Sequence, residues 1–242
     1  MPEEEFYVGY LPTPPRLKRF VWACVIAILL AAAGIGAVGA ARQRDPGNGT
    51  WNLDRSDAID GTFLASPYPM LVTPQALILL VGDGKHGATS AADLDGRAVR
   101  VTGHRIERGN LKLIEVEKIE ATGAAPLALP ARSWARQVTL RGEIVDPKCF
   151  GGAMKPGDGK PHKACATLCL RGGIPPVFVS RNPAGQIDTY VLVDEDDRAL
   201  TGPTLEAIIP YVADEVEVTG QLWRIGEGTF FAINAARPIR RL

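Results

Sequence analysis

Val216-Glu-Val-Thr-Gly220, in the C-terminal part of the chain, repeats the earlier segment Val99-Arg-Val-Thr-Gly103. In both segments valine alternates with a polar residue, and a period of two is typical of a half-buried strand. Related β-rich segments surround each copy in the same order: Gly61–Leu64, Ala76–Val81 and Leu111–Val116 in the first, Gly142–Val145, Thr189–Val193 and Thr229–Ile233 in the second. The chain therefore contains two copies of one β-rich unit.

The order of the segments predicts the fold of each copy. Three strands, a short linking helix and a closing hairpin are the elements of the OB-fold, a five-stranded Greek-key barrel. We expect the linking helix at Thr204–Ile209 in the second copy and at Ser90–Leu94 in the first. The predicted fold is mainly β, with one OB-like domain over residues 58–122 and another over residues 134–242.

Phe20–Ala40 is a long apolar segment without a charged residue. As a helix it would measure roughly 30 Å, which is the thickness of the hydrocarbon core of a bilayer. Because a cleaved signal peptide usually has a shorter apolar region, we expect a retained transmembrane helix over residues 20–40. Residues 1–19 are then an N-terminal tail, and the polar residues 41–57 are a tether.

Charge indicates the direction of this helix and excludes one class of partner. Three basic residues precede the apolar segment and two follow it: Arg16, Lys18 and Arg19, then Arg42 and Arg44. This bias favours a cytoplasmic N-terminus, with one pass through a bacterial inner membrane and the barrels in the periplasm. The whole chain has 27 basic and 27 acidic residues, so we expect no nucleic-acid partner, although OB-folds often bind one.

The second copy is longer than the first, and its additional residues hold most of the cysteine in the chain. The insertion, residues 147–175, contains Cys149, His162, Cys165 and Cys169. The chain has four cysteines in all, so three thiols and an imidazole in one short segment indicate a site.

The insertion also has the signals of a short helix. Pro161 suits a first helical turn, and glycine at 172 and 173 suits a helix end. His162, Cys165 and Cys169 then lie at positions i, i+3 and i+7, on one face. Several glycines make the preceding loop pliable, so Cys149 can fold back over that face.

The four residues support three interpretations. As ligands, Cys149, His162, Cys165 and Cys169 match a Cys₃His set for zinc, and the sulfurs suit copper(I). The C-x₃-C spacing resembles the copper-binding pair of cytochrome oxidase assembly factors. Alternatively, Cys149 forms a disulfide with Cys165 or Cys169, since thiols oxidise outside the cytoplasm, and one thiol remains free. The third interpretation is a redox-active thiol pair.

Residues 142–241 resemble a group of membrane-anchored bacterial envelope proteins that share a C-x₁₂-H-x₂-C-x₃-C segment. The positions that carry the resemblance are Cys149, Gly152, Met154–Gly157, Gly159, Lys160, His162, Cys165, Ala166, Cys169, Gly172 and Gly173. This resemblance implies no activity. An anchor followed by an OB-type barrel is also similar to the haem chaperone of cytochrome c maturation. Its His-x₃-Tyr haem anchor has no counterpart in the terminal ARPIRRL, and the C-x-x-C-H motif is missing, so we expect no haem.

We therefore expect a non-catalytic accessory or binding module, anchored in the membrane and exposed outside the cytoplasm. Its Cys/His segment would bind zinc or copper or form a disulfide, and its partner would be another membrane or envelope protein, such as a respiratory assembly. The alternative is a thiol-disulfide oxidoreductase that uses Cys165 and Cys169. His86 and His104 are interpreted as loop histidines, because their surroundings match no ligand or phosphate-loop pattern.

Overall fold

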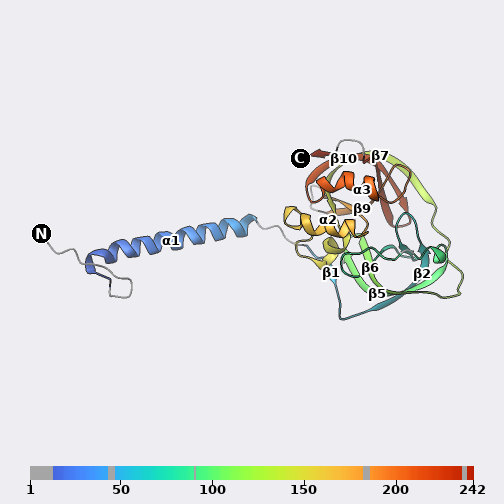
Figure 1. Ribbon diagram of the computed structural model, residues 1–242, viewed down its shortest axis with the longest axis horizontal. Helices are drawn as coiled ribbons and strands as arrows, with labels where there is room; N and C mark the ends of the chain where they lie inside the picture. Colours follow the sequence, from blue (N-terminus) through green and yellow to red (C-terminus); the bar gives the residue numbers. More distant parts are fainter. Residues whose placement is uncertain (1–12, 43–46, 90, 182–185, 236–238) are drawn as a thin grey trace. The chain divides into compact units, whose positions relative to one another are not determined.

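The computed structural model describes the chain except residues 1–12, 43–46, 90, 182–185 and 236–238 (Figure 1). It contains two compact units, Met1–Asp45 and Pro46–Leu242. Among the described residues, the first unit contains helix α1, and the second contains the strands and the other helices.

Helix α1 spans Pro15–Arg42, and none of its residues is buried. It is long and apolar enough to cross a membrane. The helix includes the predicted segment 20–40 and extends beyond it at both ends. Pro15 is its first residue, a position where the missing N–H of proline has no helical acceptor to lose. Most of the predicted tail, residues 1–12, lies outside the described residues.

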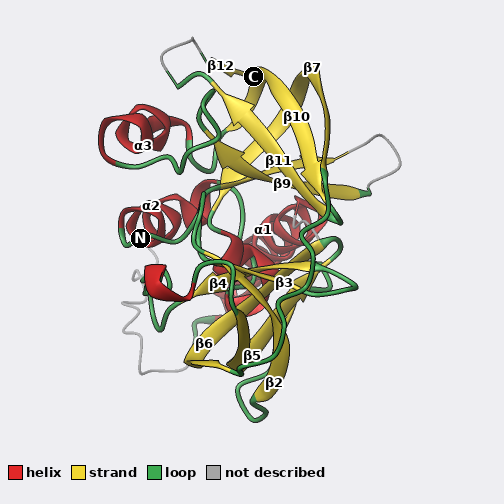
Figure 2. Cartoon of the chain, turned by 90° about the vertical axis from the view of Figure 1, so that its right-hand side faces the viewer, coloured by secondary structure: helices red, strands yellow, loops and turns green. Residues whose placement is uncertain are grey.

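The second unit is mainly β and contains two closed five-stranded barrels (Figure 2). The first barrel and its edge strand comprise β1 Thr50–Trp51, β2 Asp57–Leu64, β3 Met70–Val72, β4 Leu77–Val81, β5 Ala98–Arg108 and β6 Leu111–Ala121. The second comprises β7 Arg132–Val145, β8 Val177–Arg181, β9 Ile187–Val193, β10 Glu215–Ile225, β11 Gly228–Ile233 and the edge strand β12 Arg240–Arg241.

Both barrels close in the same way. In the first barrel β2 pairs with β3 and β5, β3 with β4, and β5 with β6. The barrel is closed by a parallel pairing of β4 with β6. In the second barrel β9 and β11 make the equivalent parallel pair, and β10 pairs with both β7 and β11. This order is that of the OB-fold, so the fold predicted from the repeat is confirmed.

The linking helices also occur where the repeat predicts them. In the second barrel α3 spans Gly202–Ile208, and Thr201 and Thr204 form a capping box at its start. A short 3₁₀ helix, η4, follows at Ile209–Tyr211. In the first barrel the counterpart is one 3₁₀ turn, η1 Ala92–Leu94, and Ser90 lies outside the described residues.

The repeated glycine has a steric reason. A Cβ atom at Gly103 would lie 2.1 Å from the backbone oxygen of Glu115, and one at Gly220 would lie 2.3 Å from that of Ala232. Both glycines lie in long strands, β5 and β10, where the backbone of the paired strand approaches closely, a place where strands often need glycine. The glycine that both copies of the repeat share is therefore required by the close packing of the paired strands in each barrel.

The two barrels share a hydrophobic core in addition to their own. One cluster of buried side chains combines Met70 and Leu113 of the first barrel with Val179 and Phe230 of the second. Tyr68 crosses the same boundary, because its hydroxyl donates to the backbone oxygen of Leu192 at 2.8 Å. Burial of apolar surface stabilises by about 25 cal/mol per Å², so the pairing of the barrels contributes to the stability of both.

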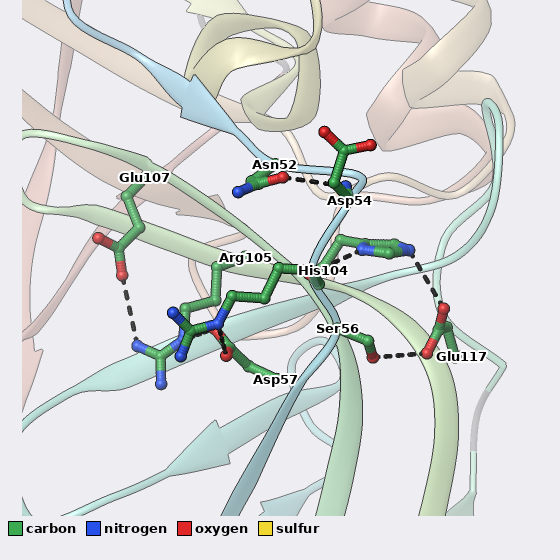
Figure 3. Close-up of polar contacts among 9 residues, drawn as sticks. Asn52, Asp54, Ser56, Asp57, His104, Arg105, Glu107 and Glu117 are labelled. Carbon is green, nitrogen blue, oxygen red and sulfur yellow. Dashed lines mark hydrogen bonds and ion pairs between the residues drawn. The ribbon is translucent and has the colours of Figure 1, made fainter.

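Part of the segment interpreted as a tether is bound to the first barrel. Thr50 and Trp51 form β1, which pairs antiparallel with β5. Polar contacts hold the residues that follow (Figure 3): Ser56 donates to Glu117 at 2.7 Å, and Arg105 lies 2.8 Å from Asp57. His104, within β5, contacts Glu117 at 3.1 Å and the backbone oxygen of Arg55 at 3.1 Å. This histidine therefore has a structural role in a strand.

Candidate metal centre

The insertion folds as three short helical segments. A π-type turn, η2, spans Cys149–Ala153, and a 3₁₀ turn, η3, spans Lys160–His162. Helix α2 follows at Lys163–Arg171. Pro161 lies in η3 and Gly172 follows α2, as the helix signals predict. The segment between η2 and η3 folds back, so Cys149 in the π-type turn lies close to Cys165 and Cys169 of α2.

The insertion brings its three thiols together. The sulfur atoms of Cys149, Cys165 and Cys169 all lie within 4.8 Å of one another. Cys149 and Cys169 are 6 % and 1 % exposed, whereas Cys165 is partly exposed. All four cysteines, including Cys24 in α1, are free. No disulfide is formed, so the predicted disulfide bridge from Cys149 to the helix is absent.

His162 belongs to a second group that shares one member with the first. Its ligand atom lies within 4.8 Å of those of Asp146 and Cys149. His162 Nε2 is 3.2 Å from Asp146 Oδ2, and the other carboxylate oxygen accepts the backbone N–H of Cys149 at 3.0 Å. Asp146 therefore orients the imidazole and caps the turn that carries Cys149. The four predicted ligands thus form two overlapping groups.

The first barrel supplies a cation to the sulfur group. Lys85 Nζ donates to Cys165 Sγ at 2.8 Å and to Cys169 Sγ at 3.6 Å. Lys85 belongs to the glycine-rich loop after β4 and is next to His86, which the sequence predicts to be only a loop histidine. The site is consequently assembled from both copies of the repeat.

Three hydrogen bonds and one close backbone approach fix the Lys85 loop. The backbone N–H of Gly87 donates to the backbone oxygen of Gly172 at 2.9 Å. A Cβ atom at Gly172 would lie 1.9 Å from the backbone oxygen of Lys85, so the two segments approach too closely for any other residue. Lys148 Nζ donates to the backbone oxygens of Gly82 and Gly84 at 2.9 and 2.8 Å. The loop is therefore held against the insertion.

Lys148 is itself buried between the barrels. Its Nζ also donates to Glu115 Oε1 of β6 at 2.9 Å, and the two side chains are 4 % and 8 % exposed. With two backbone oxygens and one carboxylate as acceptors, the three N–H bonds of the ammonium are satisfied. Burial of a paired charge costs less than burial of an isolated one, which accounts for a lysine inside this boundary.

Contacts at this site shift the pKa values of Cys169, Cys149 and Lys85. The thiol of Cys149 donates to Cys169, and this bond together with the Lys85 ammonium holds the pKa of Cys169 below its ordinary value, against burial and Asp146. The bond to Cys169 and burial raise the pKa of Cys149. The bond to Cys165 raises the pKa of Lys85. Of the two hydrogen-bonded thiols, Cys169 is therefore the one whose ionisation the site favours, and Cys149 the one whose ionisation it opposes.

Three residues of the site were not predicted: Asp146, Lys85 and Lys148. Asp146 had a local signal, since an Asp-Pro pair directly after a strand and three residues before Cys149 is a common capping arrangement. The two lysines had none. Among the other candidates, His86 is exposed and contacts the backbone oxygen of Asp83. Met154 is 47 % exposed.

No family model, curated protein or solved structure matches this chain. The chemistry of the site is therefore argued from its donor atoms. Three sulfur donors form a soft ligand set, which suits copper(I) and zinc rather than magnesium or calcium. The Cys/His group could hold a metal ion.

Proposed function

We propose that this protein is a membrane-anchored metal-binding module whose ligands are Cys149, Cys165 and Cys169. The observation that carries the proposal is the convergence of three sulfur atoms within 4.8 Å, without a disulfide. A metal ion at their centre would bring each sulfur to about 2.3 Å, which requires only small movements of side chains. Copper(I) and zinc are the candidate ions.

The anchor and the exposure of one ligand support the rest of the proposal. Helix α1 retains the protein at a membrane, and the charge bias around it favours a periplasmic location for the barrels. Cys165 is the ligand nearest to solvent, since it alone of the three is partly exposed. We propose that the ion passes through this position to or from another envelope or respiratory protein, and that the module itself catalyses no reaction.

Metal analysis of the full-length protein in detergent tests the proposal. Protein purified under reducing, chelator-free conditions is loaded with copper(I) or zinc, desalted and analysed for metal and protein. We expect one ion per chain with at least one of the two metals, and sulfur ligands in its X-ray absorption spectrum. The Cys149→Ser/Cys165→Ser/Cys169→Ser variant should bind none, and Cys24→Ser, in α1, should bind as the unaltered chain does. Absence of stoichiometric metal from the unaltered chain would refute the proposal.

The second candidate function is that of a thiol-disulfide oxidoreductase. Cys165 is partly exposed and lies beside Cys169, whose pKa is lowered, and Lys85 contacts both sulfurs. In this case the pair would transfer two electrons and two protons to a substrate disulfide. Equilibration of the protein with glutathione redox buffers, followed by mass analysis, should then show a reversible Cys165–Cys169 bond at a mild potential. A bond that forms only under strong oxidants would exclude this function.

A further inference from the structure

Lys85 contacts the sulfur group at Cys165, its partly exposed member. Cys149 and Cys169 are buried, whereas Cys165 and Lys85 are both partly exposed. The ammonium lies 2.8 Å from Cys165 Sγ and 3.6 Å from Cys169 Sγ. The cation therefore lies beside the ligand of the three that is most accessible to solvent.

Among the described residues, no fourth His, Cys, Asp or Glu ligand atom joins the group of three sulfurs. His162 is the candidate from the sequence, but its Nε2 pairs with Asp146 at 3.2 Å. Its ligand atom forms a group with Asp146 and Cys149, and not with Cys165 and Cys169. The imidazole would have to move toward the other two sulfurs before it could complete a four-ligand site.

We propose that Lys85 keeps the sulfur site three-coordinate and thereby selects copper(I) over zinc. The inference rests on the proposed metal-binding function. Zinc in proteins is almost always tetrahedral and needs a fourth ligand, whereas copper(I) prefers soft thiolates. An ammonium has three donors and no lone pair, so it cannot serve as that ligand, and it lies beside two of the three sulfurs. Its charge also offsets the negative charge of the thiolates.

The position of Lys85 is fixed well enough for this role. The Gly87–Gly172 hydrogen bond and the two bonds from Lys148 hold the loop on both sides of Lys85. The second copy of the repeat contributes the sulfurs and the first contributes the cation. Metal selectivity in this protein would thus depend on the contact between its two barrels.

Competition for copper(I) and zinc in full-length protein tests the inference. Affinities are measured anaerobically in detergent against chelators of known strength, and the coordination number is measured by X-ray absorption. We expect three sulfur ligands for copper(I) and weak zinc binding in the unaltered chain. Lys85→Ala should raise the zinc affinity relative to copper(I) by at least about tenfold, with one oxygen or nitrogen added to the zinc shell.

Two further variants separate charge from general disturbance. Lys85→Arg keeps the cation and should retain the preference of the unaltered chain. Lys163→Ala, on α2, removes a lysine that pairs with Asp214 and should change nothing at the metal. An unchanged metal preference in Lys85→Ala, or zinc bound by four ligands in the unaltered chain, would overturn the proposed role of Lys85 but not the metal-binding function. Failure of the unaltered chain to bind either ion would overturn the metal-binding function itself.

Discussion

At the scale of single residues, Lys148 is the position where a small change should have a large effect on stability. Lys148→Met leaves Glu115 as a buried carboxylate without its cation and frees the backbone oxygens of Gly82 and Gly84. Removal of one partner from a buried ion pair typically costs about 3–5 kcal/mol. We expect a decrease of that size in the free energy of unfolding by urea, followed by tryptophan fluorescence.

A double variant distinguishes the loss of the ion pair from a general packing defect. In Lys148→Met/Glu115→Leu no buried charge is left unpaired, so most of the lost stability should return, as in other proteins where an ion pair is replaced by apolar side chains. If the double variant is less stable than the single one, the pair is not the cause.

The lowered pKa of Cys169 gives a prediction about pH. The folded-state pKa of this thiol is depressed, so its ionisation stabilises the folded protein above the unfolded pKa, and this contribution is lost as the pH falls through the folded pKa. In reduced, metal-free protein we expect thiolate absorbance in the ultraviolet to persist below the ordinary thiol pKa of about 8.5. Cys169→Ser should remove this signal, and Lys85→Met should move its midpoint upward. A midpoint at the ordinary value or above contradicts the assignment.

The ligand residues could be predicted from the sequence because they lie close together in the chain, where helix periodicity relates them. Lys85 could not, because it reaches Cys165 across 80 residues of sequence and across a barrel boundary. Its surroundings resemble those of any glycine-rich turn. The place of His162 was predicted less well: it lies in the turn before α2 and pairs with Asp146, which has no helical relation to it.

At the scale of elements, the contact between the Lys85 loop and the end of α2 depends on Gly172. Its φ of −75° is ordinary for any residue, so the effect of Gly172→Ala should come from the clash with the backbone of Lys85. We expect lower stability and a weaker preference for copper(I) over zinc, because Lys85 moves from the sulfurs. Gly39→Ala, where a Cβ atom meets nothing within 4 Å, is the control and should leave both measurements unchanged.

The strands were the most predictable elements. The repeat indicated their order twice, and the alternation of apolar and polar residues indicated which side of each strand is buried. Four of the described strands were not located from the sequence: β1, β3, β8 and β12. β1 has two residues, Thr50–Trp51, which are too few to show a period in a segment rich in glycine and aspartate. Its strand conformation comes from pairing with β5, a tertiary contact that overrides weak local preference.

At the scale of the whole molecule, α1 predicts the behaviour of the protein in cells. In fractionated bacteria the full chain should remain with membranes in alkaline carbonate and be released by detergent. In spheroplasts a protease added outside should digest the barrels and leave an N-terminal tag intact, if the charge bias sets the orientation. A protected barrel unit would reverse the proposed orientation.

The shared core between the barrels has a kinetic consequence. Each barrel is completed by a parallel strand pair, and the site also needs a lysine and a cysteine that are distant along the chain. Structures dominated by such long-range contacts fold slowly. If the proposed metal binding holds, the ion would therefore bind late, after both barrels have folded. A chain delayed before that stage would expose its three thiols to oxidants.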